Sequence, residues 1–312
     1  MNAWYFRFLF LISLLCPRPG WAEINSSETI VIGGIKQWIC IKGIRESDPV
    51  LLFLHGGPGG SSGYADQFTG ELQKHFLVVE WDQRESGKTG KLNTSGQPLT
   101  VSLFEDDTFE MINYLRARFS HDKIYLLGHS WGGFLGLAAT AKHPELIAGY
   151  FAISPMVYQM ESERASLEFM KRKAKTEDNI LASNELSLVK VPFENGLQLY
   201  YHRKWVALLM GDKPASLAYV EAWSTKWLSL FNEASQVNFF LAAPEIKCPI
   251  YFFLGTNDFQ TYFKLTEDYY RTVKADKKEL FWFTRSGHLI TKTEPKKLQE
   301  IILRQLALNP VN

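Results

Sequence analysis

The chain has 312 residues, which suits one large α/β domain with an insertion or two small domains. Its 46% apolar and 21% charged residues are ordinary for a globular protein, which excludes a disordered or collagen-like chain. Lys and Arg number 34 and Asp and Glu 33, so the formal charge is +1. We expect no nucleic-acid partner, because phosphate binding needs a clustered positive excess.

Residues 1–22 have the pattern of a secretory signal peptide. A single charge precedes an apolar run at 8–16, which is much shorter than the roughly 20 residues of a membrane span. Gly20 and Ala22 are small residues at the −3 and −1 positions of a cleavage site before Glu23. We expect an exported protein, periplasmic or secreted, with no stable membrane span after processing. An uncleaved N-terminal anchor is the alternative.

The rest of the chain begins with apolar runs at 30–32 and 37–41, which flank two glycines and predict an antiparallel hairpin. Short β-branched or aromatic runs then alternate with segments of helical periodicity. This alternation predicts a mostly parallel sheet flanked by helices on both faces. The expected strands are 50–54, 76–80, 123–127, 147–153, 250–254 and 280–283. The expected helices are 66–75, 100–119, 131–142, 263–273 and 295–306.

The alternation stops near residue 155 and resumes near residue 246. The intervening segment is rich in helix formers, lacks strand-like runs and holds four of the six Met residues. We therefore expect a helical cap at 155–246, inserted into a core formed by 23–154 and 247–312.

Cys40 and Cys248 remain once residues 1–22 are removed. Both lie in apolar strand-like runs, which favours buried free thiols, and a disulfide between them is the alternative in an exported protein. The sequence has no CxxC motif or Cys/His cluster, so we expect no metal and no cofactor.

Residues 128–132 read Gly-His-Ser-Trp-Gly and fit the G-x-S-x-G motif. The motif follows an expected strand and precedes an expected helix, which is the context it requires. A sharp strand-to-helix turn lifts the serine hydroxyl above the sheet, at the N-terminus of the helix. Ser130 is therefore the expected nucleophile of a serine hydrolase.

A serine hydroxyl is a weak nucleophile until a base removes its proton. In this type of site the acid and then the base follow the serine along the chain. His288 lies just after the last expected strand, and Asp258 lies just after the strand before it. We expect His288 to be the base and Asp258 to orient its imidazole and stabilise the imidazolium.

Residues 55–60 read His-Gly-Gly-Pro-Gly-Gly and follow the strand expected at 50–54. A backbone with few side chains can approach a substrate closely and direct its N–H groups at it. We expect the N–H groups of Gly57 and Trp131 to stabilise the oxyanion. Pro58 has no N–H and can only shape the loop.

Together with these two motifs, a Trp-Asp-Gln-Arg stretch at 81–84 and a Ser-Gly-Lys-Thr stretch at 86–89 resemble the proline iminopeptidase group of α/β-hydrolases. The resemblance covers 28–154 and 246–307. It implies an α/β-hydrolase fold with a helical cap over the site. It also implies an exopeptidase that removes N-terminal proline or other residues from small peptides.

The chain departs from that group at two places. Glu85 stands where the DQRGxG pattern has glycine. The group's cap carries a Trp-x-x-Trp-Glu stretch whose glutamate helps to hold the free amine, whereas here Leu228 follows Trp223-Ser-Thr-Lys-Trp227. An aminopeptidase would therefore need another cap acid to pair with the substrate ammonium. The candidates are Glu161, Glu163, Glu194 and Glu221.

Trp223 and Trp227 are the candidate substrate-binding residues of the cap. With Phe231 they recur every four residues and share one face of a helix. This face either packs the cap's own core or forms part of the substrate pocket.

Three functions remain open from the sequence. The first is an aminopeptidase of the proline iminopeptidase type that cleaves small peptides through an acyl-enzyme. The second is a carboxylester or other acyl hydrolase of small apolar substrates. The third is a non-catalytic binding protein, against which the intact Ser, Asp and His set argues. In each case we expect a small-molecule or short-peptide ligand, while the oligomeric state stays open.

Overall fold

An eight-stranded sheet forms the centre of the molecule, in the order β1-β2-β4-β3-β5-β6-β8-β10. The computed structural model describes residues 23–93 and 96–308. β2 pairs antiparallel with β1 and β4, and every other neighbouring pair is parallel, which confirms the expected mostly parallel sheet. The strands are β1 (Ile24–Ile32), β2 (Ile35–Gly43), β3 (Val50–Leu54), β4 (Leu77–Asp82), β5 (Ile124–His129), β6 (Ile147–Ile153), β8 (Ile250–Gly255) and β10 (Lys278–Phe283).

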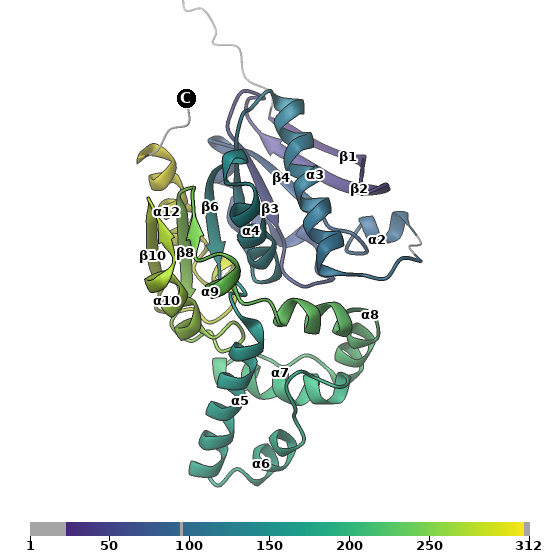
Figure 1. Cartoon of the computed structure of the whole chain (residues 1–312), viewed down its shortest axis with the longest axis vertical. Coiled ribbons are helices and arrows are strands. Elements are labelled where there is room, and N and C mark those ends of the chain that lie inside the picture. The colour runs from purple at the N-terminus through teal and green to yellow at the C-terminus, as the bar shows by residue number, and fades with distance from the viewer. Residues whose placement is uncertain (1–22, 94–95, 309–312) are drawn as a thin grey trace, which may run out of the picture.

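Helices cover both faces of this sheet because its strands carry apolar side chains on both sides. In β3, Leu52 packs in one buried cluster with residues of α3 and α4, whereas Phe53 packs in a second cluster with residues of α1 and α12. Figure 1 shows α3 and α4 in front of the central strands. The helices of the core are α1 (Asp66–Thr69), α2 (Thr89–Leu92), α3 (Val101–Phe119), α4 (Trp131–Lys142), α10 (Phe263–Thr272), α11 (Ile290–Thr293) and α12 (Pro295–Leu308).

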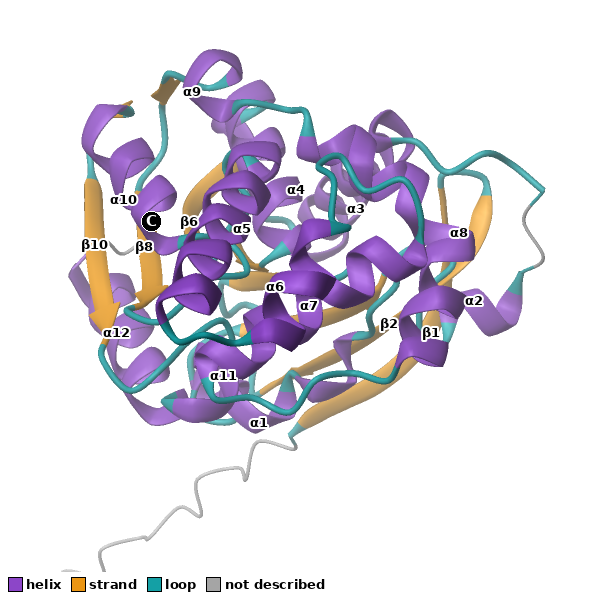
Figure 2. Cartoon of the chain, turned by 90° about the horizontal axis from the view of Figure 1, so that it is seen from below, coloured by secondary structure: helices purple, strands orange, loops and turns teal. Residues whose placement is uncertain are grey.

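Between β6 and β8 the chain forms five helices in succession. They are α5 (Gln159–Thr176), α6 (Ile180–Ser187), α7 (Gly196–Met210), α8 (Leu217–Ser235) and α9 (Phe239–Ala242). Figure 1 shows α5 to α8 gathered at one end of the sheet, and in Figure 2 α6 and α7 lie in front of the strands. The N–H of Phe239 donates to the carbonyl oxygen of Val157 at 3.0 Å, so the start and end of this insertion meet.

The segment expected as the cap ends in a short strand rather than in a helix. β7 (Glu245–Ile246) pairs in parallel with β9 (Lys274–Ala275), which follows α10 of the core. The helix expected over 66–75 is also interrupted. It divides into α1 and a 3₁₀ turn at Leu72–Lys74, with Gly70, a weak helix former, between them.

Cys40 and Cys248 are buried and unpaired. Cys40 lies in β2 and Cys248 lies two residues before β8, and these strands are five positions apart in the sheet. At about 4.8 Å per position the two strands are separated by roughly 24 Å, far beyond the reach of a disulfide.

None of the helices in the described ranges is long and apolar enough to cross a membrane. The expected signal peptide, residues 1–22, lies outside the described residues.

Candidate active site

Ser130 occupies a strained turn between β5 and α4. Its φ of 57° and ψ of −112° are costly for a side chain that is not glycine. Neighbouring glycines make the turn possible, because a Cβ at Gly132 would lie 1.9 Å from the carbonyl oxygen of Leu54. A Cβ at Gly128 would lie 2.4 Å from the carbonyl oxygen of Gly132. The two motif glycines therefore let the turn press against β3 and hold the serine at the N-terminus of α4.

His288 and Asp258 come from the loops after β10 and β8 and are in contact. His288 Nδ1 lies 3.0 Å from Asp258 Oδ2, and both side chains are buried. The other contacts of Asp258 fix its orientation. Its Oδ1 accepts hydrogen bonds from the N–H groups of Gln260 and Thr261, each at 3.0 Å, and its Oδ2 accepts one from the Thr261 hydroxyl at 2.9 Å.

The surroundings of Asp258 favour its ionised form. Burial acts to raise its pKa, but the charge of His288 and the hydrogen bonds from His288 and Thr261 outweigh burial and leave the pKa below its usual value. The carboxylate is therefore available to orient the imidazole and to stabilise its protonated form.

Two adjoining cavities meet beside His288. The first, here called the catalytic cavity, has a volume of about 390 Å³ and is lined by Ser130, His288 and the Gly56–Gly60 loop. The second, the cap cavity, has a volume of about 450 Å³ and extends between α7 and α8. Both are lined by Gly57, Trp223, Gln260, His288, Leu289, Tyr219 and Lys292. Sites with this arrangement can take a substrate with one part on each side of the reacting carbonyl.

Gly57 and Trp131, the expected oxyanion donors, flank Ser130. Gly57 lines both cavities with its backbone alone. Trp131 is the first residue of α4, so its N–H has no acceptor within the helix. The Trp131 side chain points away into the core, where its Nε1–H donates to Gln83 Oε1 at 2.8 Å.

Tyr64 and His129 contact the catalytic loops and were not among the site residues expected from the sequence. The Gly56 N–H donates to the Tyr64 hydroxyl at 3.3 Å, and that hydroxyl lies 3.0 Å from His129 Nδ1. His129 Nε2 lies 3.2 Å from the carbonyl oxygen of His288 and must donate to it. Burial lowers the pKa of His129 to about 3, so the ring is neutral and its Nδ1 accepts from Tyr64.

The Asp-Gln-Arg stretch at 82–84 does not line either cavity. It forms hydrogen bonds with the loops that surround the site. Asp82 accepts hydrogen bonds from the N–H groups of Ser62 and Lys88, both at 2.7 Å. Gln83 donates to the carbonyl oxygen of His55 at 3.2 Å.

Arg84 forms a fully buried, bidentate ion pair with Asp107. No sequence pattern placed Asp107 in this network, because it lies 23 residues from Arg84 on α3.

Glu85, which stands where the DQRGxG pattern has glycine, contacts the cap. Its φ is 59°, a conformation that favours glycine. Its carboxylate pairs with Lys226 Nζ on cap helix α8 at 2.7 Å, and the same ammonium donates to the Glu85 carbonyl oxygen at 3.3 Å. This residue therefore joins the core to the cap.

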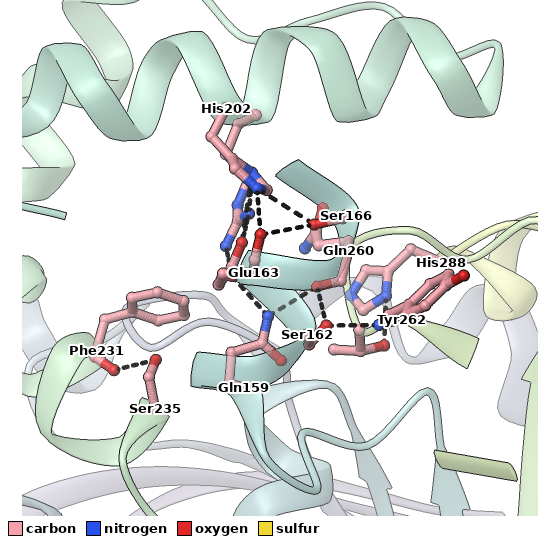
Figure 3. Close-up of polar contacts among 12 residues, drawn as sticks. Gln159, Ser162, Glu163, Ser166, His202, Phe231, Ser235, Gln260, Tyr262 and His288 are labelled. Carbon is pink, nitrogen blue, oxygen red and sulfur yellow. Dashed lines mark hydrogen bonds and ion pairs between the residues drawn. The ribbon is translucent and has the colours of Figure 1, made fainter. Parts of the chain in front are cut away.

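None of the four cap acids expected as amine ligands lines either cavity. Glu161 and Glu194 are exposed and pair with Arg164 and Lys190, and Glu221 is exposed on α8. Glu163 is buried and already neutralised by Arg203. Figure 3 shows its side chain among those of His202 and Gln159. Its partners are Arg203, whose Nη1 lies 2.6 Å away, His202 at 3.3 Å and the Gln159 side-chain amide at 2.6 Å.

Asp212 is the one acidic residue among those that line the cap cavity. It lies in the loop between α7 and α8, two residues after the end of α7, and is exposed. The sequence offered no signal for it, because a loop acid after a helix-ending glycine is common on any protein surface.

The expected aromatic face of α8 divides between two roles. Trp223 is half-buried and lines both cavities. Trp227 is 5% exposed, stacks edge-on against Phe104 with ring centroids 6.3 Å apart, and lies where a Cβ on Gly59 would be only 2.4 Å from its indole. Phe231 is buried but reaches the cap cavity. The face therefore both packs the molecule and forms part of the pocket.

Among residues 23–93 and 96–308, no cluster of three His, Cys, Asp or Glu side chains could hold a metal ion.

Comparisons with known proteins agree with this site and fold. Residues 49–274 match the model of the family described as alpha/beta hydrolase fold. The chain belongs to this family. It is 30% identical to the probable aminopeptidase YbaC of Bacillus subtilis, over 92% of this chain and 98% of that protein. It is 24% identical to a proline iminopeptidase of Heyndrickxia coagulans, over 81% of this chain and 88% of that protein.

These relatives confirm the expected resemblance to the proline iminopeptidase group, and the chain is a serine hydrolase of the α/β-hydrolase fold. Among solved structures, an esterase of Pyrococcus furiosus superposes with a TM-score of 0.63 at 14% identity and covers 93% of this chain and 92% of its own. That similarity shows the shared fold alone.

Proposed function

We propose that this protein is an exported serine aminopeptidase of the proline iminopeptidase type, acting on small peptides. The observation that carries the proposal is the meeting of Ser130, His288 and Gly57 on one cavity, with Asp258 held 3.0 Å from His288. The similarity to YbaC over nearly the whole of both chains supports peptide hydrolysis over other chemistries of this fold.

In the proposed mechanism Ser130 Oγ attacks the carbonyl carbon of the first peptide bond, and His288 Nε2 takes the hydroxyl proton. Asp258 accepts the hydrogen bond from His288 Nδ1–H and stabilises the imidazolium. The N–H groups of Gly57 and Trp131 stabilise the oxyanion. His288 then gives its proton to the leaving nitrogen, the C–N bond breaks, and an acyl-enzyme remains. Water hydrolyses this ester, with His288 as base, and frees Ser130.

Recognition of the free amine falls to Asp212 in this proposal. A substrate ammonium enclosed beside the cap needs a partner of opposite charge, because an unpaired buried charge is costly. Glu163 cannot supply it, since Arg203 and Gln159 already occupy its oxygens. Asp212 makes no side-chain ion pair with another described residue and lines the cap cavity.

The experiment compares three chromogenic substrates, each with wild-type protein and with Ser130→Ala. They are the nitroanilide of proline and its N-acetylated form, which release nitroaniline, and a short-chain nitrophenyl ester, which releases nitrophenol. We expect the free-amine anilide to be cleaved far better than its acetylated form, with all cleavage lost in Ser130→Ala. Equal cleavage of the two anilides, or turnover of the ester alone, would replace the aminopeptidase function with that of an acyl hydrolase.

Export rests on the sequence of residues 1–22, with its short apolar run and the small residues before Glu23. The test is mass spectrometry of protein recovered from the exported fraction of the native cell. A chain that begins at Glu23 supports cleavage there, and a chain that begins at Met1 argues for an uncleaved anchor.

A further inference from the structure

The catalytic cavity is lined by one residue that carries a full charge, Lys292. The other lining residues are glycines, aromatic, aliphatic and uncharged polar residues, together with the triad's His288. Lys292 lies on α11, which begins two residues after His288, and it lines the cap cavity as well. This lysine therefore lies where the two cavities adjoin, four residues after the expected catalytic base.

Lys292 is also uncompensated. Arg203 of the cap cavity is neutralised by buried Glu163. Lys213, like Lys292, forms no ion pair within the described residues, but it lines the cap cavity alone. The Lys292 ammonium forms no ion pair or side-chain hydrogen bond with any residue of the described ranges. A substrate bound at Ser130 thus meets one free positive charge on this side of the site.

That charge constrains how a small peptide can lie. A substrate ammonium beside Lys292 would be repelled, so the amine is placed toward the cap cavity, where Asp212 is. The leaving residue then extends toward Lys292. A free α-carboxylate is the peptide group of opposite charge that every short peptide carries at that end.

We propose that Lys292 binds the α-carboxylate of the leaving residue, so that the preferred substrates are dipeptides with a free C-terminus. The inference rests on the proposed aminopeptidase function and names its substrate class. The length of the substrate peptide matters because each further residue moves its C-terminal carboxylate about 3.5 Å away from the scissile bond. In a dipeptide the carboxylate lies on the residue that carries the scissile nitrogen, within reach of a long side chain that lines the same cavity as His288. In longer peptides it lies outside the cavity.

Lys213 provides a matched control for this role. Like Lys292 it is an exposed lysine that lines the cap cavity, but it does not line the catalytic cavity. Loss of a general positive field would appear in both variants. Loss of a carboxylate contact near the scissile bond would appear in Lys292→Gln and not in Lys213→Gln.

The experiment measures kcat/KM for a dipeptide and for the same dipeptide with an amidated C-terminus. We expect wild-type protein to prefer the free acid by about tenfold or more, mainly through a lower KM. Lys292→Gln should lose this preference, whereas Lys292→Arg and Lys213→Gln should keep it. A tripeptide with a free C-terminus should be cleaved less well than the dipeptide by wild type.

Two results would overturn the inference while the aminopeptidase function stands. One is equal cleavage of the acid and the amide by wild type, and the other is an unchanged acid preference in Lys292→Gln. If wild type cleaves neither peptide but hydrolyses nitrophenyl esters, the proposed function itself fails and the inference falls with it.

Discussion

Trp223 of cap helix α8 donates its indole Nε1–H to the carbonyl oxygen of Pro58 at 2.9 Å. The bond joins the cap to the glycine-rich loop that carries Gly57, one of the two proposed oxyanion donors. The Glu85–Lys226 ion pair lies three residues further along α8 and holds the same helix against the core. The position of the cap is thereby coupled to the geometry of the loop that faces the reacting carbonyl.

The two tryptophans of α8 should respond differently to substitution. Trp227→Ala should lower the free energy of unfolding by about 3–5 kcal/mol, because Trp227 is packed against Phe104 and Gly59. Trp223→Phe keeps an aromatic ring but loses the indole N–H bond to Pro58, so it should change KM and kcat with a stability loss of only about 1 kcal/mol. Chemical denaturation and steady-state kinetics on both variants check these two expectations. A larger loss of stability in Trp223→Phe than in Trp227→Ala would contradict them.

Asp258→Asn should lower kcat by about ten-thousandfold while the protein stays folded, because the amide no longer holds the reactive imidazole tautomer. The measurement is kcat for the best anilide or ester substrate, with circular dichroism as the check on folding. Asp268→Asn on exposed α10 is the matched control and should keep wild-type kcat. If Asp268→Asn were the damaging change, the choice of acid would be wrong.

Asp212→Asn should raise KM for free-amine substrates by about tenfold, because a charge-assisted hydrogen bond is lost. The same variant should treat N-acetylated or ester substrates as wild type does. Glu221→Gln, an exposed cap acid that lines neither cavity, serves as the control. Equal effects of the two variants would show that Asp212 acts through the general field and not by contact.

His202 should make the protein less stable in mild acid. Burial is the main cause that lowers its pKa to about 4, with Arg203 acting in the same direction and Glu163 against it. The unfolded chain binds this proton near pH 6.5 and the folded chain near pH 4. The stability due to neutral His202 is thus complete above pH 6.5 and is lost as the pH falls toward 4, on the order of 3 kcal/mol in all.

Urea denaturation at pH 7.5 and pH 5 measures this effect. The wild-type difference between the two values should exceed that of His202→Gln, because the variant lacks the titrating ring. His75→Gln, at an exposed position, should keep the wild-type difference. A difference that is equal in His202→Gln and wild type would exclude His202 as its source.

The parts of the fold and site that depend on local sequence could be predicted, and those that depend on distant pairs could not. The turn at Ser130 was predictable because the glycines on both sides are required by its backbone. The contact between Asp258 and His288 was predictable because each lies within five residues of the end of a predicted strand. Glu163, in contrast, is removed from substrate binding by Arg203, a residue 40 positions away, and this contact leaves no trace in the local pattern.

The places of Asp212, Tyr64 and Lys292 at the site could not be predicted from the sequence, for a similar reason. Each lies in or beside a short loop or turn whose sequence is unremarkable, and its place at the site follows from how the cap and the core meet. The polarity of the substrate pocket is therefore a property of the assembled fold.

The hydrogen bond between Phe239 and Val157 closes the helical insertion at its base. Since the two ends lie side by side, the insertion leaves the sheet and returns to it at one place, and β6 and β8 pair with each other without it. An insertion anchored in this way can be exchanged for another of different length without disturbing strand register. Evolution, or a designer, can thus change the chamber above the serine while leaving the sheet below it intact, provided that the contacts of α8 with Pro58 and Glu85 are kept.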